Sequence, residues 1–133
     1  KKSLAYTVTS FYTPGLEPGF FGLYIGTAPQ KEEEAVAAMK EQLDLLLKNG
    51  VTDEELERAK NYLVGSFEIG LQQNSSQAAK IGFDELYNIG YEEYERYPEE
   101  VYAVTKEDVL DAAKKYIDLE AYTLVIVKPE SSG

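Results

Sequence analysis

The sequence contains neither histidine nor cysteine. A catalytic zinc ion is normally held by three protein side chains, most of them imidazoles, and a zinc site made only of carboxylates would be unusual. Catalytic triads that depend on imidazole are excluded, and so are disulfides and thiolate nucleophiles. We therefore expect no catalytic residue, no metal ligand and no cofactor in this chain.

Positive charge is also scarce. Thirteen Lys and Arg stand against 24 Asp and Glu, which gives a formal net charge of -11. Such a field repels phosphate backbones, and no basic stripe offsets it, so a nucleic-acid partner is not expected. No stretch approaches the roughly 18 uninterrupted apolar residues of a membrane helix, so a membrane partner is not expected either.

What is present fits an ordinary globular domain. The chain has 133 residues, of which 44% are hydrophobic and 28% charged, and both length and composition are typical of a single domain. A strand pattern begins at once, without an initiator Met or an apolar leader. We interpret residues 1–133 as one incomplete domain from the interior of a longer protein.

The first 27 residues predict an antiparallel hairpin over residues 4–27. Two stretches rich in β-branched and aromatic residues, 4–12 and 20–27, flank the sequence TPGLEPG, whose Pro and Gly residues require a loop. A third strand pattern, YTLVIVK, lies at 122–128 and predicts a buried final strand.

Between the strands, helical periodicity predicts a layer over residues 30–117. Thr52 to Glu55 and Thr105 to Asp108 have the pattern of N-terminal caps, and Asn74 or Ser75 is expected to cap a third helix. Pro98 either interrupts a short helical stretch over 92–104 or starts a new helix at its first turn. The expected inward faces of the second and third helices are formed by Leu56, Ala59, Leu63 and Phe67, and by Ala79, Phe83 and Leu86.

This order predicts an α+β fold in which a small antiparallel sheet has helices packed on one face. The predicted order of elements is two strands, four or five helices and a final strand. With four helices this order is β-β-α-α-α-α-β. Three strands make a thin sheet for a domain of this size, so we expect segments outside this sequence to complete it.

Two groups of side chains could carry chemistry or binding. Acidic residues cluster at 32–34, 53–55, 92–93 and 99–100; they could supply a general acid and base, but each cluster also lies where a helix N-terminus favours negative charge. Tyrosines gather in the second half of the chain and could form a platform for peptide or sugar, or pack their rings on the helices. These five are Tyr87, Tyr91, Tyr94, Tyr97 and Tyr102.

Several motifs in this order resemble the pitrilysin/insulinase family of zinc peptidases, which includes the mitochondrial processing peptidases. Members open a strand with R-E-K-K-G-L-A-Y-x-V and end the hairpin with I-G-T-A-P. Here KKSLAYTV and IGTAP match, with Ser3 where Gly is usual. The likeness continues through VTDEELERAKNYLVGSFEIGLQQNSSQA and GYEEYERYPEEVYAVTKEDVLDAAKKYI into the final strand.

The resemblance implies a metallohydrolase-like fold of the LuxS/mitochondrial processing peptidase type. It implies a second-type domain that binds no zinc, whereas the zinc is held by an H-x-x-E-H motif elsewhere in the enzyme or its partner. In the family, an Arg and a Tyr separated by six residues hold the substrate peptide. Tyr6 occupies the Tyr position, and the Arg would lie two residues before Lys1.

The functional hypothesis is a non-catalytic fragment of a zinc metalloendopeptidase that helps enclose a chamber and binds substrate peptide through Tyr6. A Tyr in a strand interior can equally be a packing residue, so both roles for Tyr6 stay open. The expected partners are a catalytic zinc-binding domain or subunit of the same family, as a homo- or heterodimer, and a peptide substrate. Two alternatives are a structural member of the family without peptidase activity and a stand-alone, tyrosine-rich binding module. We expect a bacterial protein, with the compartment open between cytoplasm and periplasm.

Overall fold

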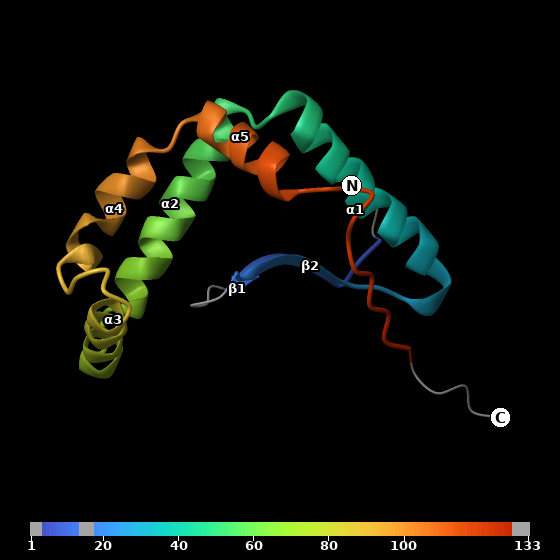
Figure 1. Cartoon of the computed structure of the whole chain (residues 1–133). Helices are drawn as coiled ribbons and strands as arrows, with labels where there is room; N and C mark the ends of the chain where they lie inside the picture. Colours follow the sequence, from blue (N-terminus) through green and yellow to red (C-terminus); the bar gives the residue numbers. More distant parts are fainter. Residues whose placement is uncertain (1–3, 14–17, 129–133) are drawn as a thin grey trace. The chain divides into compact units, whose positions relative to one another are not determined.

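The computed structural model describes residues 4–13 and 18–128 and has an α+β fold with a two-stranded antiparallel sheet and five α-helices (Figure 1). It divides into two compact units. The first comprises Lys1–Lys48 and Tyr116–Gly133, and the second comprises Asn49–Lys115. That both units belong to one incomplete domain stays a prediction.

The hairpin predicted for residues 4–27 is present in the first unit. Strand β1 (Thr7–Thr13) pairs antiparallel with β2 (Phe20–Gly26), so that Thr7 lies opposite Gly26 and Thr13 opposite Phe20. The ladder begins three residues later than the expected Leu4. Residues 4–6 nevertheless stay attached to the hairpin, because the Tyr6 backbone N–H donates to the Gly26 carbonyl over 2.8 Å.

A short 3-10 helix, η1 (Pro29–Lys31), leads from the hairpin into helix α1 (Glu32–Asn49). Three glutamates occupy the first turn of α1, where the helix dipole stabilises their negative charge. Ala35 is fully buried, and the predicted apolar stripe is half-buried along its length. The stripe consists of Val36, Met39, Leu43, Leu46 and Leu47.

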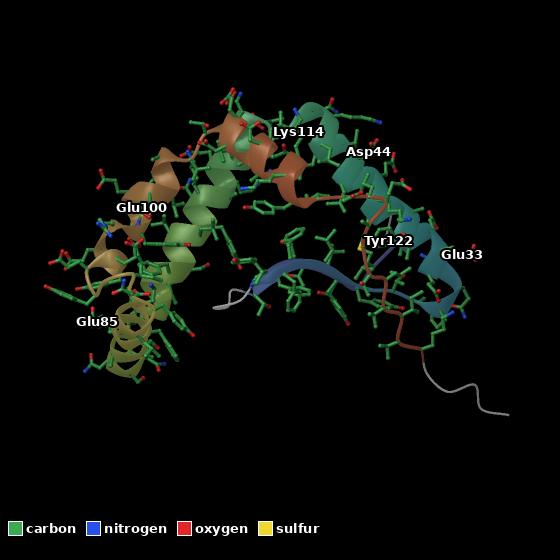
Figure 2. The ribbon with its side chains drawn as sticks, in the orientation of Figure 1. Glu33, Asp44, Glu85, Glu100, Lys114 and Tyr122 are labelled. Atoms are coloured by element: carbon green, nitrogen blue, oxygen red, sulfur yellow. The ribbon has the colours of Figure 1, made fainter. Side chains whose placement is uncertain are left out.

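The predicted final strand at 122–128 is wrong for this structure. The segment forms no strand, and its side chains are exposed. It lies beside α1, where the Lys40 ammonium is 4.6 Å from the centroid of the Tyr122 ring and Lys128 pairs with Glu32 over 2.7 Å (Figure 2). A strand needs a neighbouring edge to bond with, so β propensity alone did not produce one here.

The second unit is helical. It consists of α2 (Asp53–Gly70), α3 (Asn74–Leu86), α4 (Glu93–Ala103) and most of α5 (Lys106–Tyr116). Helix α4 packs against both α2 and α3 (Figure 1). The Phe67 and Tyr97 rings contact each other with centroids 4.3 Å apart, and Lys60 donates to the Tyr102 carbonyl over 2.8 Å. The described residues thus contain five α-helices, within the predicted four or five, one more than in the order β-β-α-α-α-α-β.

Two of the predicted helix caps are confirmed. The Thr52 hydroxyl accepts from the Glu55 N–H, while the Glu55 carboxylate accepts from the Thr52 N–H. Thr105 and Asp108 make the same reciprocal pair at α5. The cap of α3 was predicted at Asn74 or Ser75, one or two residues too late, because Gln73 is the N-cap and makes no side-chain capping bond.

Helix α4 runs through Pro98 without interruption, although proline removes one helical hydrogen bond. The contact between Tyr97 and Phe67 holds this turn of α4 against α2, so tertiary packing overrides the local preference. The predicted interruption at Pro98 is therefore wrong.

The predicted inward faces of α2 and α3 also need correction. In α2, Val64 is buried with 5% exposure, whereas Leu63 is exposed. In α3, Phe83 and Leu86 are exposed, and Asp84 is buried with 4% exposure beside Lys80. Packing on α4 therefore selects a different face of α3 from its apolar one.

None of the helices in the described part of the chain has both the length and the apolar composition that a membrane span requires.

Candidate functional site

Tyr6 lies immediately before β1, at the end of the hairpin opposite the Pro- and Gly-rich loop. Two bonds fix its backbone surroundings. The Tyr6 N–H donates to the Gly26 carbonyl, and the Thr27 hydroxyl donates to the Leu4 carbonyl over 2.5 Å. The side chain itself is 85% exposed. Tyr6 thus combines an anchored backbone with a phenol that is open to solvent.

A shallow hollow of about 170 Å³ adjoins Tyr6. The approach to β1 forms one wall and the start of η1 forms the other. Its lining residues are Leu4, Ala5, Tyr6, Ala28 and Lys31. A hollow lined by both apolar and polar residues could accept a backbone carbonyl or a short side chain of an extended peptide.

The sequence prediction did not include Lys31 in this site. Lys31 is distant from Tyr6 along the chain, and only the antiparallel return of β2 brings the two residues to the same end of the hairpin. The IGTAP motif, which ends β2 and leads into η1, was the signal that could have indicated this neighbourhood.

The tyrosines of the second half do not form one platform among the described residues. Tyr97 packs on Phe67, and Tyr102 donates to the Asn61 side chain over 3.1 Å. Tyr91 and Tyr94 donate to the carboxylates of Glu92 and Glu95, and these bonds raise the pKa of both phenols. The hydroxyls of Tyr91, Tyr94 and Tyr102 are thus engaged by separate local partners.

The acidic clusters act mainly through local structure. Glu55 closes a helix cap, and the bond from Arg96 lowers the pKa of Glu93. Glu32 pairs with Lys128. Each of these carboxylates has a partner that explains its position without a catalytic role.

The side chains of this chain do not fit a zinc site. The whole sequence lacks imidazole and thiolate donors. Across residues 4–13 and 18–128, no three Asp or Glu side chains are grouped so that they could hold a metal ion.

The profile of the family described as "Peptidase M16 inactive domain" matches residues 1–63, which include the hairpin and Tyr6. An uncharacterized zinc protease of Streptomyces coelicolor is 34% identical over 86 residues, covering 65% of this chain and 19% of the relative. The uncharacterized zinc protease YmxG of Bacillus subtilis is 28% identical over 131 residues, covering 98% of this chain and 32% of the relative. The chain thus spans about a third or less of these relatives.

The fold is similar to that of the periplasmic protease PqqL from Escherichia coli. The TM-score is 0.63 at 18% identity, and the match covers 85% of this chain and 13% of PqqL. The chain is thus similar in sequence to parts of bacterial zinc proteases and in fold to part of a periplasmic protease. The inactive-domain model of the M16, or pitrilysin, family thus matches just under half of the chain, and these similarities confirm the resemblance read from its motifs.

Proposed function

We propose that this chain is the zinc-free part of a zinc-dependent metalloendopeptidase, where it helps enclose the substrate chamber and binds substrate peptide through Tyr6. The observation that carries the proposal is the match of the inactive-domain profile to the stretch that contains Tyr6. The printed names of the relatives, which are zinc proteases, support the reaction class.

The geometry around Tyr6 supports a binding role over a packing role. A packing tyrosine hides its ring, whereas Tyr6 is exposed and its backbone is anchored to β2. Anchoring reduces the conformational freedom that is lost when a ligand binds. The phenol could donate a hydrogen bond to a peptide carbonyl, and this bond would strengthen as negative charge develops on the oxygen.

Zinc would be supplied by a catalytic domain or subunit of the same family. When bound there, a zinc ion polarises the peptide carbonyl and activates water. The part of the present chain is to hold and orient the peptide. The adjoining hollow lined by Leu4 and Ala28 offers an apolar surface for the neighbouring residue of that peptide.

The test is the substitution Tyr6→Phe in the native protein assembled with its zinc-binding partner. It removes one hydroxyl and keeps the ring. If the phenol stabilises developing charge, kcat/KM for a fluorogenic peptide falls by roughly 10²–10³. If it binds only the ground state, the loss is about 1 kcal/mol and is confined to KM. Zinc content should not change.

Tyr24→Phe is the matched control, because Tyr24 is an exposed tyrosine of the same hairpin and lies outside the hollow. Equal activity of the Tyr6→Phe variant and wild type, with bound zinc in both, would refute the role of Tyr6. An assembly that holds zinc but cleaves no peptide in any form would instead favour a structural member of the family.

A further inference from the structure

The backbone before β1 leaves the regular strand pairing at Tyr6. The ladder ends with Thr7 opposite Gly26, and the same register continued by one residue would place Tyr6 opposite Thr27. Instead, the Tyr6 N–H donates to the Gly26 carbonyl over 2.8 Å, and the chain bends at Tyr6. The direction in which Tyr6 leaves the hairpin is therefore set by bonds outside the regular ladder.

Thr27 supplies one of these bonds. Its hydroxyl donates to the Leu4 carbonyl over 2.5 Å, although the two residues lie 23 positions apart in the sequence. This distance is at the short end of the range for O–H···O hydrogen bonds. Leu4 and Thr27 are both half-buried, so water can replace the hydroxyl as a donor only in part.

The two bonds hold consecutive peptide units. The Leu4 carbonyl belongs to the unit between Leu4 and Ala5, and the Tyr6 N–H belongs to the unit between Ala5 and Tyr6. Because each peptide unit is planar, only the two dihedral angles of Ala5 can vary between them, and the two bonds restrict both angles. On its other side, Tyr6 is followed directly by β1 at Thr7.

We propose that Thr27 is a positioning residue for Tyr6, because its hydroxyl bond to Leu4 sets the backbone from which the phenol meets the substrate peptide. The inference rests on the proposed function of Tyr6. The lining of the hollow beside Tyr6 does not include Thr27, so Thr27 acts through the chain and not by contact with the peptide. Gly26 and Thr27 are neighbours in the IGTAP motif, and each of them holds one of the two peptide units before Tyr6.

Thr27→Val tests the positioning role, since it removes the hydroxyl and keeps the branched shape of the side chain. In the native protein assembled with its zinc-binding partner, we expect kcat for a fluorogenic peptide to fall about tenfold while KM changes by less than about twofold, because the phenol is aimed less well at the developing charge. Thr27→Ser keeps the donor and should stay within about threefold of wild type. An equal loss in Thr27→Ser and Thr27→Val would overturn the proposal.

Thr9→Val is the matched control. It makes the same chemical change in the same hairpin, but the Thr9 hydroxyl donates to the neighbouring Ser10 carbonyl over 3.3 Å and not to the segment before Tyr6. We expect its activity to stay within about twofold of wild type, as for an ordinary surface substitution. A loss in Thr9→Val as large as in Thr27→Val would overturn the proposal, because any hydroxyl of the hairpin would then have the same effect.

A double-mutant cycle shows whether Thr27 acts through Tyr6. In the Tyr6→Phe background, Thr27→Val should cost less than about twofold, because the group that Thr27 positions is gone. Equal losses in both backgrounds would overturn the proposal. If Tyr6→Phe lowers activity and Thr27→Val does not, the positioning role is refuted and the proposed function stands. If Tyr6→Phe matches wild type, the proposed function fails and the positioning role fails with it.

Amide hydrogen exchange measures the positioning without reference to activity. We expect Thr27→Val to speed exchange of the Tyr6 N–H about tenfold or more, since the adjacent peptide unit is released, while exchange over β1 and β2 keeps its wild-type rate. Thr27→Ser should leave the Tyr6 N–H unchanged. Unchanged exchange at Tyr6 in Thr27→Val would overturn the proposal. Faster exchange throughout both strands would also overturn it, because Thr27 would then hold the whole hairpin and not Tyr6 in particular.

Discussion

The two units of the chain reach order by different routes. In the helical unit, side-chain contacts join separate helices, such as Phe67 with Tyr97 and Lys106 with Asp53 over 2.7 Å. In the hairpin unit, β1 has no buried residue, and its extensive contacts are with β2 alone. Helices satisfy their backbone hydrogen bonds within themselves, whereas a strand depends on its neighbours. A stretch of family sequence can therefore keep its helices while its strands remain short of partners.

The largest expected effect tests whether contacts between helices hold the helical unit together, and it comes from removing the ring contact between α2 and α4. Phe67→Ala deletes the ring that packs on Tyr97. Because Phe67 is half-buried, we expect the free energy of unfolding of this unit to fall by about 2 kcal/mol, somewhat less than for a fully buried Phe. Urea denaturation followed by circular dichroism measures the change.

Phe83→Ala is the control for Phe67→Ala, because Phe83 is an exposed Phe of α3 whose ring stacks only within its own helix, on Tyr87. We expect its effect to stay below about 0.5 kcal/mol, as for ordinary surface substitutions. Equal losses for the two variants would mean that packing between α2 and α4 does not hold the unit together.

Glycine substitutions should have opposite signs in the two units. A Cβ added to Gly22 would lie closer to the Phe11 ring than real Cβ atoms approach, whereas a Cβ added to Gly65 in α2 meets nothing within 4 Å. We expect Gly22→Ala to destabilise the hairpin by about 1 kcal/mol and Gly65→Ala to stabilise the helical unit by about 0.5–1 kcal/mol. Hydrogen exchange resolves the units separately, and a stabilising Gly22→Ala would show that Phe11 moves aside freely.

Local signals in the sequence predicted the hairpin and both capping boxes, because these features need only neighbouring residues. Thr52 with Glu55 and the Pro- and Gly-rich loop are complete signals within a few positions. The final strand at 122–128 failed because its composition indicates β structure but cannot supply an edge to pair with. The prediction of the inward face of α3 failed for a related reason. The apolar stripe with Phe83 and Leu86 indicates a surface suited to packing, but these side chains are exposed and α4 packs on a different face.

The candidate site could be predicted only in part. Tyr6 came from a motif, and its exposure and the hollow beside it depend on how the hairpin end meets η1. Lys31 has no local signal that links it to Tyr6, since the link is made by the antiparallel return of β2. Residues brought together by strand pairing are difficult to predict when the number of strands is itself uncertain from the sequence.

The smallest expected effect concerns the reciprocal helix caps, which among the described residues occur at α2 and α5 of the helical unit. Bonds from the Thr52 backbone and hydroxyl hold the pKa of Glu55 below its ordinary 4.5, and bonds from the Thr105 hydroxyl and backbone hold the pKa of Asp108 below its ordinary 3.8. A carboxyl group whose pKa is lower in the folded state stabilises the fold above its unfolded pKa and loses this contribution as pH falls through the folded value. Stability of the helical unit should therefore fall as pH drops below about 4.5.

Thr52→Ala tests this explanation of the acid response directly. It should cost about 1 kcal/mol at neutral pH, as is usual for losing an N-cap. It should also weaken the part of the acid response that comes from the hydroxyl bond to Glu55, while the backbone N–H of residue 52 can still donate to that carboxylate. The matched control is Ser75→Ala, since Ser75 lies inside the first turn of α3 and is not its N-cap. Urea midpoints at pH 7 and at about pH 3.5 measure both effects. An unchanged pH dependence in Thr52→Ala would show that the hydroxyl bond to Glu55 does not contribute to the acid response.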